Sequence, residues 1–199
     1  MEQPELIFLN VLGSAVYGGY KAFRLFRKKK NQLFILLGAR RSGITTAISR
    51  VKETTESKVL LVDKDDIIDA QPAEQKEQLN ELMNAKPEVF GLKFYPLVKD
   101  YLKQCRKVYK GVPVVLVVHD ETLIKYLNVP TENVLSVLPT ISFFNNLVEK
   151  YKLEKYEVAI EALTKSRESL IVSHYPKKLI RNWSELEGIL TKLITITKK

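Results

Sequence analysis

Along residues 31–199, short runs of apolar residues alternate with stretches in which apolar residues recur every three or four positions. Short, β-branched runs predict buried strands, whereas the three-to-four spacing predicts amphipathic helices. The predicted strands are residues 33–37, 58–62, 112–119, 134–138 and 170–173. The predicted helices are residues 45–53, 73–84, 94–109, 141–151, 154–165 and 183–196.

Continuous apolar strands separated by helices are typical of parallel sheets whose two faces are both covered. The sequence therefore predicts an α/β fold over residues 31–199, with a five-stranded parallel sheet sandwiched by helices. Ser184 is the expected N-cap of the last helix, because Glu187 follows three residues later as in a capping box. The sequence shows no internal repeat, and the basic stretch at residues 27–32 is its linker candidate.

Residues 1–30 form a separate segment, which is predicted to be a hydrophobic helix with a basic flank. Residues 6–20 are fifteen residues without a charge, and the basic residues come after them. A helix of that length spans about 22 Å, less than the roughly 30 Å of a bilayer core. The helix reaches across if it extends to Phe26 and if Lys21 and Arg24 turn their charges towards the surface. A secretory signal carries its charges before the apolar run, so secretion is not expected.

Small residues recur at four-residue spacing in this helix, as in the pairs Ser14/Gly18 and Ala15/Gly19. Such spacing lets helices approach closely in lipid. Residues 6–26 are therefore expected to anchor the chain in a membrane or to pack against a partner helix, with a flexible tail as the third alternative. For an anchor, the basic flank predicts a domain that faces the cytoplasm or the interior of an organelle or virion.

Composition and charge bear on partners more than on the fold. A hydrophobic content of 45% and a charged content of 28% indicate a globular chain and exclude a disordered one. The net charge of +9 sits at the ends, since residues 1–30 and 171–199 each hold six Lys/Arg and two Glu. Basic ends fit a membrane surface or an acidic protein partner better than a nucleic acid, and added solubility is the alternative. The single cysteine, Cys105, fits a reducing compartment and a buried helix position.

The first predicted strand runs directly into the segment GARRSGITT at residues 38–46. A strand, a loop bracketed by two glycines and a helix start give the order of a phosphate-binding loop, whose pattern is G-x-x-x-x-G-K-[ST]. Backbone N–H groups of such a loop and the positive end of the helix attract phosphate. The lysine position of the pattern is Ile44, which brings no charge. The candidate binding residues are Gly38, Arg40, Arg41, Ser42, Gly43, Thr45 and Thr46.

Acidic residues follow two of the predicted strands, at the edge where ligands bind in open parallel sheets. Asp63 and Asp65 come after the second strand, and Asp120 comes after the third. Asp120 and the hydroxyl of Thr45 suit a Mg²⁺ ion beside a nucleotide such as ATP or GTP. Asp63 or Asp65 could orient a substrate hydroxyl as a base. The structural alternative is that these acids cap helices by accepting hydrogen bonds from backbone N–H groups.

The glycine loop, the DKDD run at residues 63–66 and the sequence VVLVVHD at residues 114–120 together resemble the small P-loop kinases of the nucleoside, nucleotide and shikimate type. The resemblance implies that the loop is a Walker A loop for nucleotide phosphates. It also implies that an acid after the second strand touches the acceptor and that a later strand carries the Walker B acid. As architecture, the resemblance covers residues 31–199.

Two departures from the family pattern argue against catalysis. Ile44 replaces the Walker A lysine, and residues 134–166, where the family's lid carries arginines, contain none. Arg40 and Arg41 could supply charge from inside the loop, although from another direction than the lysine. Losing both sources of charge would slow phosphoryl transfer by orders of magnitude.

Three functional hypotheses remain open from the sequence. The first is a non-catalytic P-loop-kinase-like structural or assembly protein, held at a membrane by its N-terminal helix within a membrane complex or an internal virion layer. The second is an atypical nucleotide-dependent small-molecule kinase or NTPase that uses Arg40 or Arg41. The third is a basic nucleic-acid-associated protein, whose affinity would fall steeply with salt. The first hypothesis accounts for the fold pattern, the missing charges and the N-terminus together.

Overall fold

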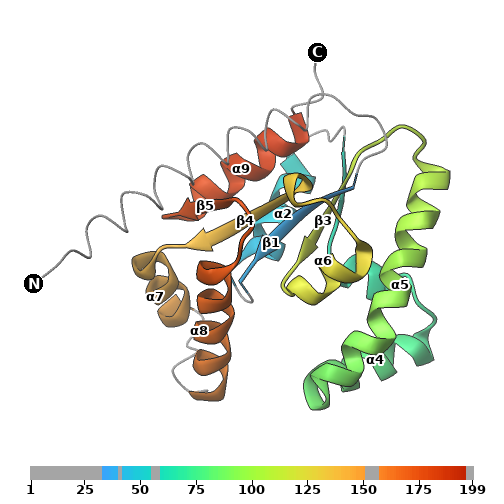
Figure 1. Ribbon diagram of the computed structural model, residues 1–199, viewed down its shortest axis with the longest axis horizontal. Coiled ribbons are helices and arrows are strands. Elements are labelled where there is room, and N and C mark those ends of the chain that lie inside the picture. The colour runs from blue at the N-terminus through green and yellow to red at the C-terminus, as the bar shows by residue number, and fades with distance from the viewer. Residues whose placement is uncertain (1–32, 40–41, 55–58, 151–156, 196–199) are drawn as a thin grey trace, which may run out of the picture.

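The computed structural model describes residues 33–39, 42–54, 59–150 and 157–195 (Figure 1). The predicted N-terminal helix at residues 6–26, the linker candidate at residues 27–32 and the loop residues Arg40 and Arg41 lie outside the described residues. Within the described part of the chain, no helix has the length and apolar character that crossing a membrane requires.

The centre of the domain is a parallel sheet of five strands, which confirms the predicted α/β fold. The strands are β1 (Leu33–Gly38), β2 (Leu60–Val62), β3 (Val114–Val118), β4 (Val134–Pro139) and β5 (Lys177–Ile180). Their order across the sheet is β2-β3-β1-β4-β5, and every neighbouring pair is parallel. The first four strands lie where the apolar runs predicted them.

The prediction of the fifth strand at residues 170–173 was wrong. Leu170 to Val172 end helix α8 (Glu157–Val172), with Leu170 buried and Val172 84% exposed. A four-residue apolar run is too short to distinguish a strand from the end of a buried helix. The true fifth strand, β5, contains two lysines, and only Ile180 is buried in it. Lysines are common in edge strands because they discourage pairing with other chains, and they removed the apolar signal here.

The remaining helices surround this sheet. They are α2 (Ile44–Thr54), α3 (Lys64–Asp69), α4 (Ala73–Ala85), α5 (Pro87–Val108), α6 (Glu121–Leu127), α7 (Ile141–Lys150) and α9 (Trp183–Thr195), and a short 3-10 turn covers Thr131–Asn133. Helices α5 and α8 are longer than predicted. The short helices α3 and α6 were not predicted, and each begins directly after an aspartate.

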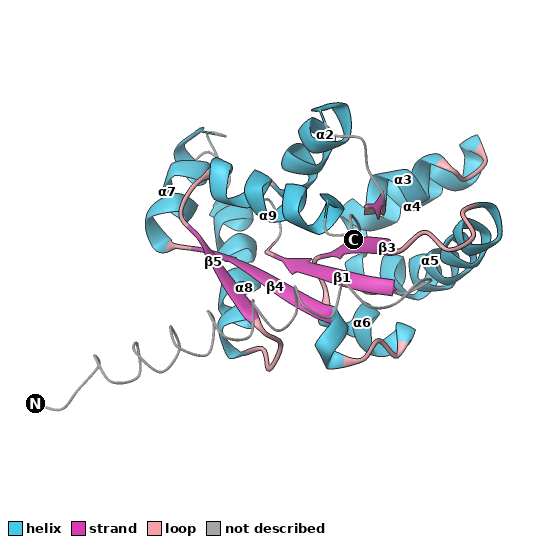
Figure 2. Cartoon of the chain, turned by 90° about the horizontal axis from the view of Figure 1, so that it is seen from above, coloured by secondary structure: helices cyan, strands magenta, loops and turns pink. Residues whose placement is uncertain are grey.

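Two hydrophobic clusters cover the two faces of the sheet, as the sandwich prediction requires. Phe34 and Leu36 of β1 join the cluster with α2, α7 and α9, whereas Ile35 and Leu37 join the cluster with α3, α4, α5, α6 and α8. Figure 2 shows α2 and α9 on one side of the sheet and α6 on the other. Because successive residues of a strand face opposite sides, β1 is buried from both faces.

The N-cap of α9 is Asn182, and the prediction of Ser184 was wrong by two residues. The backbone N–H of Glu185 donates to the Asn182 side-chain oxygen at 2.9 Å, and the Glu185 carboxylate accepts from the backbone N–H of Arg181 at 2.8 Å. The cap is the residue just before the first helical residue, and α9 starts at Trp183. This earlier start places Trp183 in the first turn of the helix.

Candidate functional site

The candidate site lies at the carboxyl ends of β1 and β3, which are neighbours in the sheet. From β1 the chain passes β3 to reach β2 at one edge of the sheet. From β3 it passes β1 in the opposite direction to reach β4. Neighbouring strands whose connections leave in opposite directions open a crevice at their carboxyl ends, where ligands bind in this class of sheet. The described residues placed there are Ser42 and Gly43 after β1 and the pair His119–Asp120 after β3.

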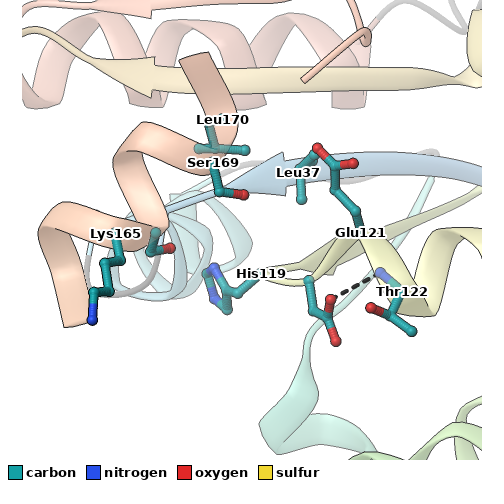
Figure 3. Close-up of a pocket in the computed structure, with 9 residues that line it drawn as sticks. Leu37, His119, Glu121, Thr122, Lys165, Ser169 and Leu170 are labelled. Carbon is teal, nitrogen blue, oxygen red and sulfur yellow. Dashed lines mark hydrogen bonds between the residues drawn. The ribbon is translucent and has the colours of Figure 1, made fainter. Parts of the chain in front are cut away.

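His119 and Asp120 tie the end of β3 to its surroundings. Nδ1 of His119 lies 2.8 Å from the Gly38 carbonyl oxygen. Since a carbonyl can only accept, the Nδ1 nitrogen carries the proton and donates this hydrogen bond. One oxygen of Asp120 accepts from the backbone N–H of Thr122 at 2.8 Å, drawn as the dashed line in Figure 3, and caps α6. The other oxygen accepts from the hydroxyl of Tyr95 on α5. Both Asp120 oxygens therefore already serve the fold.

The segment after β1 is the strand, loop and helix unit that the sequence predicted. The Ser42 backbone N–H donates to the Ala39 carbonyl at 3.1 Å, and α2 starts at Ile44. Gly43 has a φ of 79°, a conformation that residues with a Cβ adopt only at a cost. Ser42 is 3% exposed, and its hydroxyl has no hydrogen-bond partner among the described residues.

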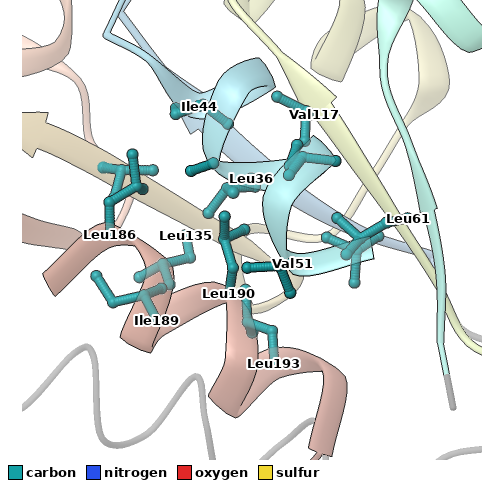
Figure 4. Packing of buried hydrophobic residues seen from close by; sticks show 14 of the residues in the cluster. Leu36, Ile44, Val51, Leu61, Val117, Leu135, Leu186, Ile189, Leu190 and Leu193 are labelled. Carbon is teal, nitrogen blue, oxygen red and sulfur yellow. The ribbon is translucent and has the colours of Figure 1, made fainter. Parts of the chain in front are cut away.

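Ile44, at the lysine position of the motif, is part of the hydrophobic core. Its side chain is 1% exposed and belongs to the cluster that α2 shares with α9 (Figure 4). A methyl group built on Gly38 would lie 1.9 Å from Cδ1 of Ile44. The isoleucine side chain therefore lies against the end of β1. It packs in the core, whereas the lysine of the motif would supply a mobile charge.

Trp183 covers the second glycine of the loop. A methyl group built on Gly43 would lie 2.0 to 3.0 Å from three carbons of the indole ring. Phe143 meets the same ring edge-on at 5.8 Å between centroids. The cations of Arg50 and Lys150 lie 5.8 and 5.2 Å from the ring centroid, within the range of cation–π attraction. No local pattern in the sequence predicts this contact.

A pocket of about 560 Å³ lies beside the loop, between α2, α3, α5 and the end of β3. It brings together most of the residues that the sequence singled out, whereas Gly38 and Asp63 do not line it. Three aromatic side chains of α5 also line the pocket. No sequence pattern connected them with the site. The predicted residues in its lining are Ser42, Gly43, Thr45, Thr46, Asp65 and Asp120. The aromatic residues are Phe90, Phe94 and Tyr95.

The described residues of the loop lack the charge that a nucleoside triphosphate with Mg²⁺ calls for at the lysine position of the motif. Ile44 offers no charge, and Trp183 packs on the side of Gly43 where a Cβ would lie. Thr45 and Asp120 line one pocket, but the Asp120 oxygens already accept two hydrogen bonds. Among the described residues, no three His, Cys, Asp or Glu side chains gather closely enough to hold a metal. The Thr45–Asp120 magnesium pair stays a prediction.

No protein-family model and no curated protein matches this chain. Solved structures that resemble it include a gluconokinase from Sinorhizobium meliloti 1021, at 12% identity over 85% of this chain and 93% of that chain, with a TM-score of 0.47. An uncharacterized protein from Eubacterium ventriosum has 12% identity over 83% and 98%, with a TM-score of 0.43. The protein APE1195 has 14% identity over 85% and 98%, with a TM-score of 0.41. Similarities of this size carry no inference about activity.

Asp63 is a buried helix cap that lies outside the pocket. It is 6% exposed, and its Oδ1 accepts a hydrogen bond from the Asp66 backbone N–H at 2.9 Å. In return, the Asp63 backbone N–H donates to Oδ2 of Asp66 at 2.9 Å. Burial raises the pKa of the Asp63 carboxyl, against the lowering effect of the Asp66 N–H. Asp65 is the acid of this run that faces the pocket, and its carboxylate lies 3.7 Å from the Lys64 ammonium.

The substitution Asp63→Asn should stabilise the domain at pH 7. The folded state holds the Asp63 proton more tightly than the unfolded state, so the parent loses stability as pH rises through the folded pKa. Asparagine keeps the cap acceptor without a charge. Urea unfolding should show the advantage shrinking as pH falls towards the ordinary value of 3.8. The exposed Asp100→Asn serves as control, and a less stable Asp63→Asn variant at pH 7 would show that the charge itself is needed.

Residues 134–166 contain no arginine, as the sequence analysis states, but Arg167 follows directly and also lies between β4 and β5. Its Nε donates to the Pro139 carbonyl at 3.0 Å. This arginine is engaged with the end of β4.

Proposed function

We propose that residues 31–199 form a non-catalytic P-loop-kinase-like domain with a structural or assembly role. The observation that supports this most strongly is the covering of both loop glycines, Gly38 by Ile44 and Gly43 by Trp183. A phosphate-binding loop works by presenting backbone N–H groups and a lysine to the transferring phosphate. Here the lysine position is occupied by a buried isoleucine, and the Trp183 side chain of α9 packs against Gly43.

The retained acids agree with this proposal, because the fold already uses them. Asp63 caps α3 and Asp120 caps α6, each through a backbone N–H. A general base or metal ligand needs an oxygen that is available to substrate or ion. Among the described residues that line the pocket, only Asp65, with a side chain 59% exposed, offers a carboxylate without capping a helix.

The chain contains one tryptophan, Trp183, and it sits on the loop, so its fluorescence tests this proposal directly. Addition of ATP or GTP with Mg²⁺ at about 1 mM, the upper end of usual Michaelis constants, should leave the emission spectrum unchanged. No phosphate release should be detected in the same samples. A saturable change at micromolar nucleotide that disappears in Gly43→Asp, together with turnover, would contradict the proposal.

We further propose that residues 6–26 tether this domain to a membrane or to a partner helix. The apolar run, the small-residue spacing and the basic flank support the tether. Full-length chain should float with vesicles containing anionic lipid, and chain lacking residues 1–30 should not. Equal flotation of both proteins would exclude the membrane tether and leave the partner helix.

An atypical small-molecule kinase or NTPase is the second candidate. It is favoured by the pocket of about 560 Å³ beside the start of α2, because Thr45, Asp65 and Asp120 all line that pocket. In that case nucleotide would bind beside Gly43, which Trp183 contacts. The nucleotide titration separates the two candidates, because binding there changes the surroundings of the ring and hence the tryptophan emission.

A further inference from the structure

The last turns of α5 and the turn that follows them, residues 101–113, carry positive charge and no acidic residue. The four cations, all exposed, are Lys103, Arg106, Lys107 and Lys110. The preceding residues 63–88 hold eight acidic residues and three lysines. The two stretches nearly cancel in the total charge, so composition alone hides this surface. Together with Val108 and Tyr109, the four cations are called the basic end of α5.

No acidic side chain among the described residues neutralises these cations. The ion pairs of the described part of the chain use other cations, namely Arg50, Lys52, Lys64, Lys76, Lys165 and Arg181. Asp66 lies within electrostatic range of Tyr101 and Cys105 on α5, but its carboxylate is paired with Lys52 at 2.9 Å. The basic end of α5 therefore presents its charge to its surroundings.

Two exposed apolar side chains lie among these cations. Val108 is 72% exposed, and Tyr109 is 48% exposed. Cations in the last turn of a helix suit its dipole, which accounts for Arg106 and Lys107. The dipole explains neither Lys110, which lies beyond the helix, nor a valine and a tyrosine left in water. Cations mixed with exposed apolar and tyrosine side chains are typical of surfaces that meet anionic lipid.

The basic end of α5 lies at the edge of the sheet where the chain enters the domain. The turn after α5 leads to Val114, which starts β3 and is the register partner of Leu33 at the start of β1 (Figure 1). Lys110 is four residues before Val114, so the two Cα atoms lie within about 14 Å of each other. The proposed tether ends at Phe26, seven residues before Leu33, which an extended chain spans with about 25 Å at most. A tether in a membrane would therefore hold this surface close to lipid.

We propose that the basic end of α5 is a second membrane contact, which docks the domain on anionic lipid with the amino edge of the sheet towards the bilayer. The inference rests on the proposed membrane tether, because four cations by themselves bind an anionic surface with a Kd on the order of 1 mM. The tether makes the second contact intramolecular and so raises its effective concentration. The carboxyl edge of the sheet, with the candidate site, then faces away from the bilayer.

Paramagnetic broadening of amide signals tests the docking on the full chain bound to bicelles. The bicelles consist of phosphatidylcholine with or without phosphatidylserine, and some of the lipid carries a spin label on its headgroup. With phosphatidylserine, the amides of residues 106–110 should broaden more strongly than those of residues 88–93 at the other end of the same helix. Without phosphatidylserine this difference should disappear, because the anionic partner of the cations is gone.

The variant Arg106→Gln/Lys107→Gln removes two of the four cations. Each cation near an anionic surface strengthens binding roughly fivefold, so this variant should lower the ratio of docked to undocked domain about 25-fold. Lys103→Gln/Lys110→Gln, which leaves the last helical turn intact, should act in the same way. The matched control Lys86→Gln/Lys93→Gln removes two exposed cations from the other end of α5 and should leave the broadening unchanged. Melting temperatures check that all three variants fold.

Three results would overturn the docking while the tether stands: equal broadening at both ends of α5, a difference that persists without phosphatidylserine, or unchanged broadening in both variants of the basic end. Amide shifts of residues 106–110 that are larger with duplex DNA than with these bicelles would assign the surface to nucleic acid and also overturn it. A full chain that does not bind the bicelles overturns both proposals. If the chain lacking residues 1–30 binds as tightly and shows the same broadening pattern, the docking is supported and the tether is wrong.

Discussion

Replacing Ile44 by lysine, the residue that the motif has at this position, should destabilise the domain instead of creating a nucleotide site. Ile44 is 1% exposed, and its Cδ1 points at Gly38 inside the core of α2 and α9. An uncompensated charge in a core costs roughly 3–5 kcal/mol. The free energy of unfolding of a domain is about 5–15 kcal/mol, so this variant should be close to unfolding. Urea unfolding and the melting temperature measure the effect.

The matched control is Thr46→Lys, which places the same side chain at an exposed position of the same helix. It should cost less than about 1 kcal/mol, mainly because a cation near a helix N-terminus is unfavourable. An Ile44→Lys protein that melts like the parent and binds ATP would show that position 44 can turn out of the core. The covered loop would then be one conformation of a working site.

Gly43→Ala should be the second severe substitution. The φ of 79° costs a residue with a Cβ about 1–3 kcal/mol. The new methyl group would also lie 2.0 Å from the Trp183 ring, and overpacking of this kind costs about 1–3 kcal/mol more. The ring must move, so the single tryptophan should become more exposed. We expect a lower unfolding free energy together with a red-shifted emission.

Two other glycines separate the causes of this effect. Gly111 has a φ of 83°, and a methyl group built on it would meet no described atom within 4 Å, so Gly111→Ala should show the backbone strain alone. A methyl group built on Gly188, inside α9, would likewise meet no described atom within 4 Å, so Gly188→Ala should stabilise by about 0.5–1 kcal/mol. If Gly43→Ala and Gly111→Ala cost the same and leave the emission unchanged, Trp183 does not press on the loop.

Local pattern was sufficient for the strands that are buried on both faces. β1, β3 and β4 are continuous apolar runs, and their burial in the structure gives the reason. It failed at the edge of the sheet, where the lysines of β5 removed the signal and the apolar end of α8 imitated it.

The candidate site was predictable only where residues lie close in sequence. The acids after β2 and β3 were found, and their alternative as helix caps is confirmed for Asp63 and Asp120. The aromatic wall of α5 was missed, because an aromatic residue on an amphipathic helix gives the same signal whether it fills a core or lines a pocket. Tyr95 reaches Asp120 only in the folded chain.

The sequence by itself determined that a strand, a glycine loop and a helix follow one another, and that the motif has isoleucine where a lysine belongs. Only the tertiary structure decided what became of that loop. Ile44 turns into the core because α9 packs against α2, and Trp183 reaches Gly43 from the far end of the chain. Both contacts depend on packing between distant segments, which no local pattern of apolar and polar residues records.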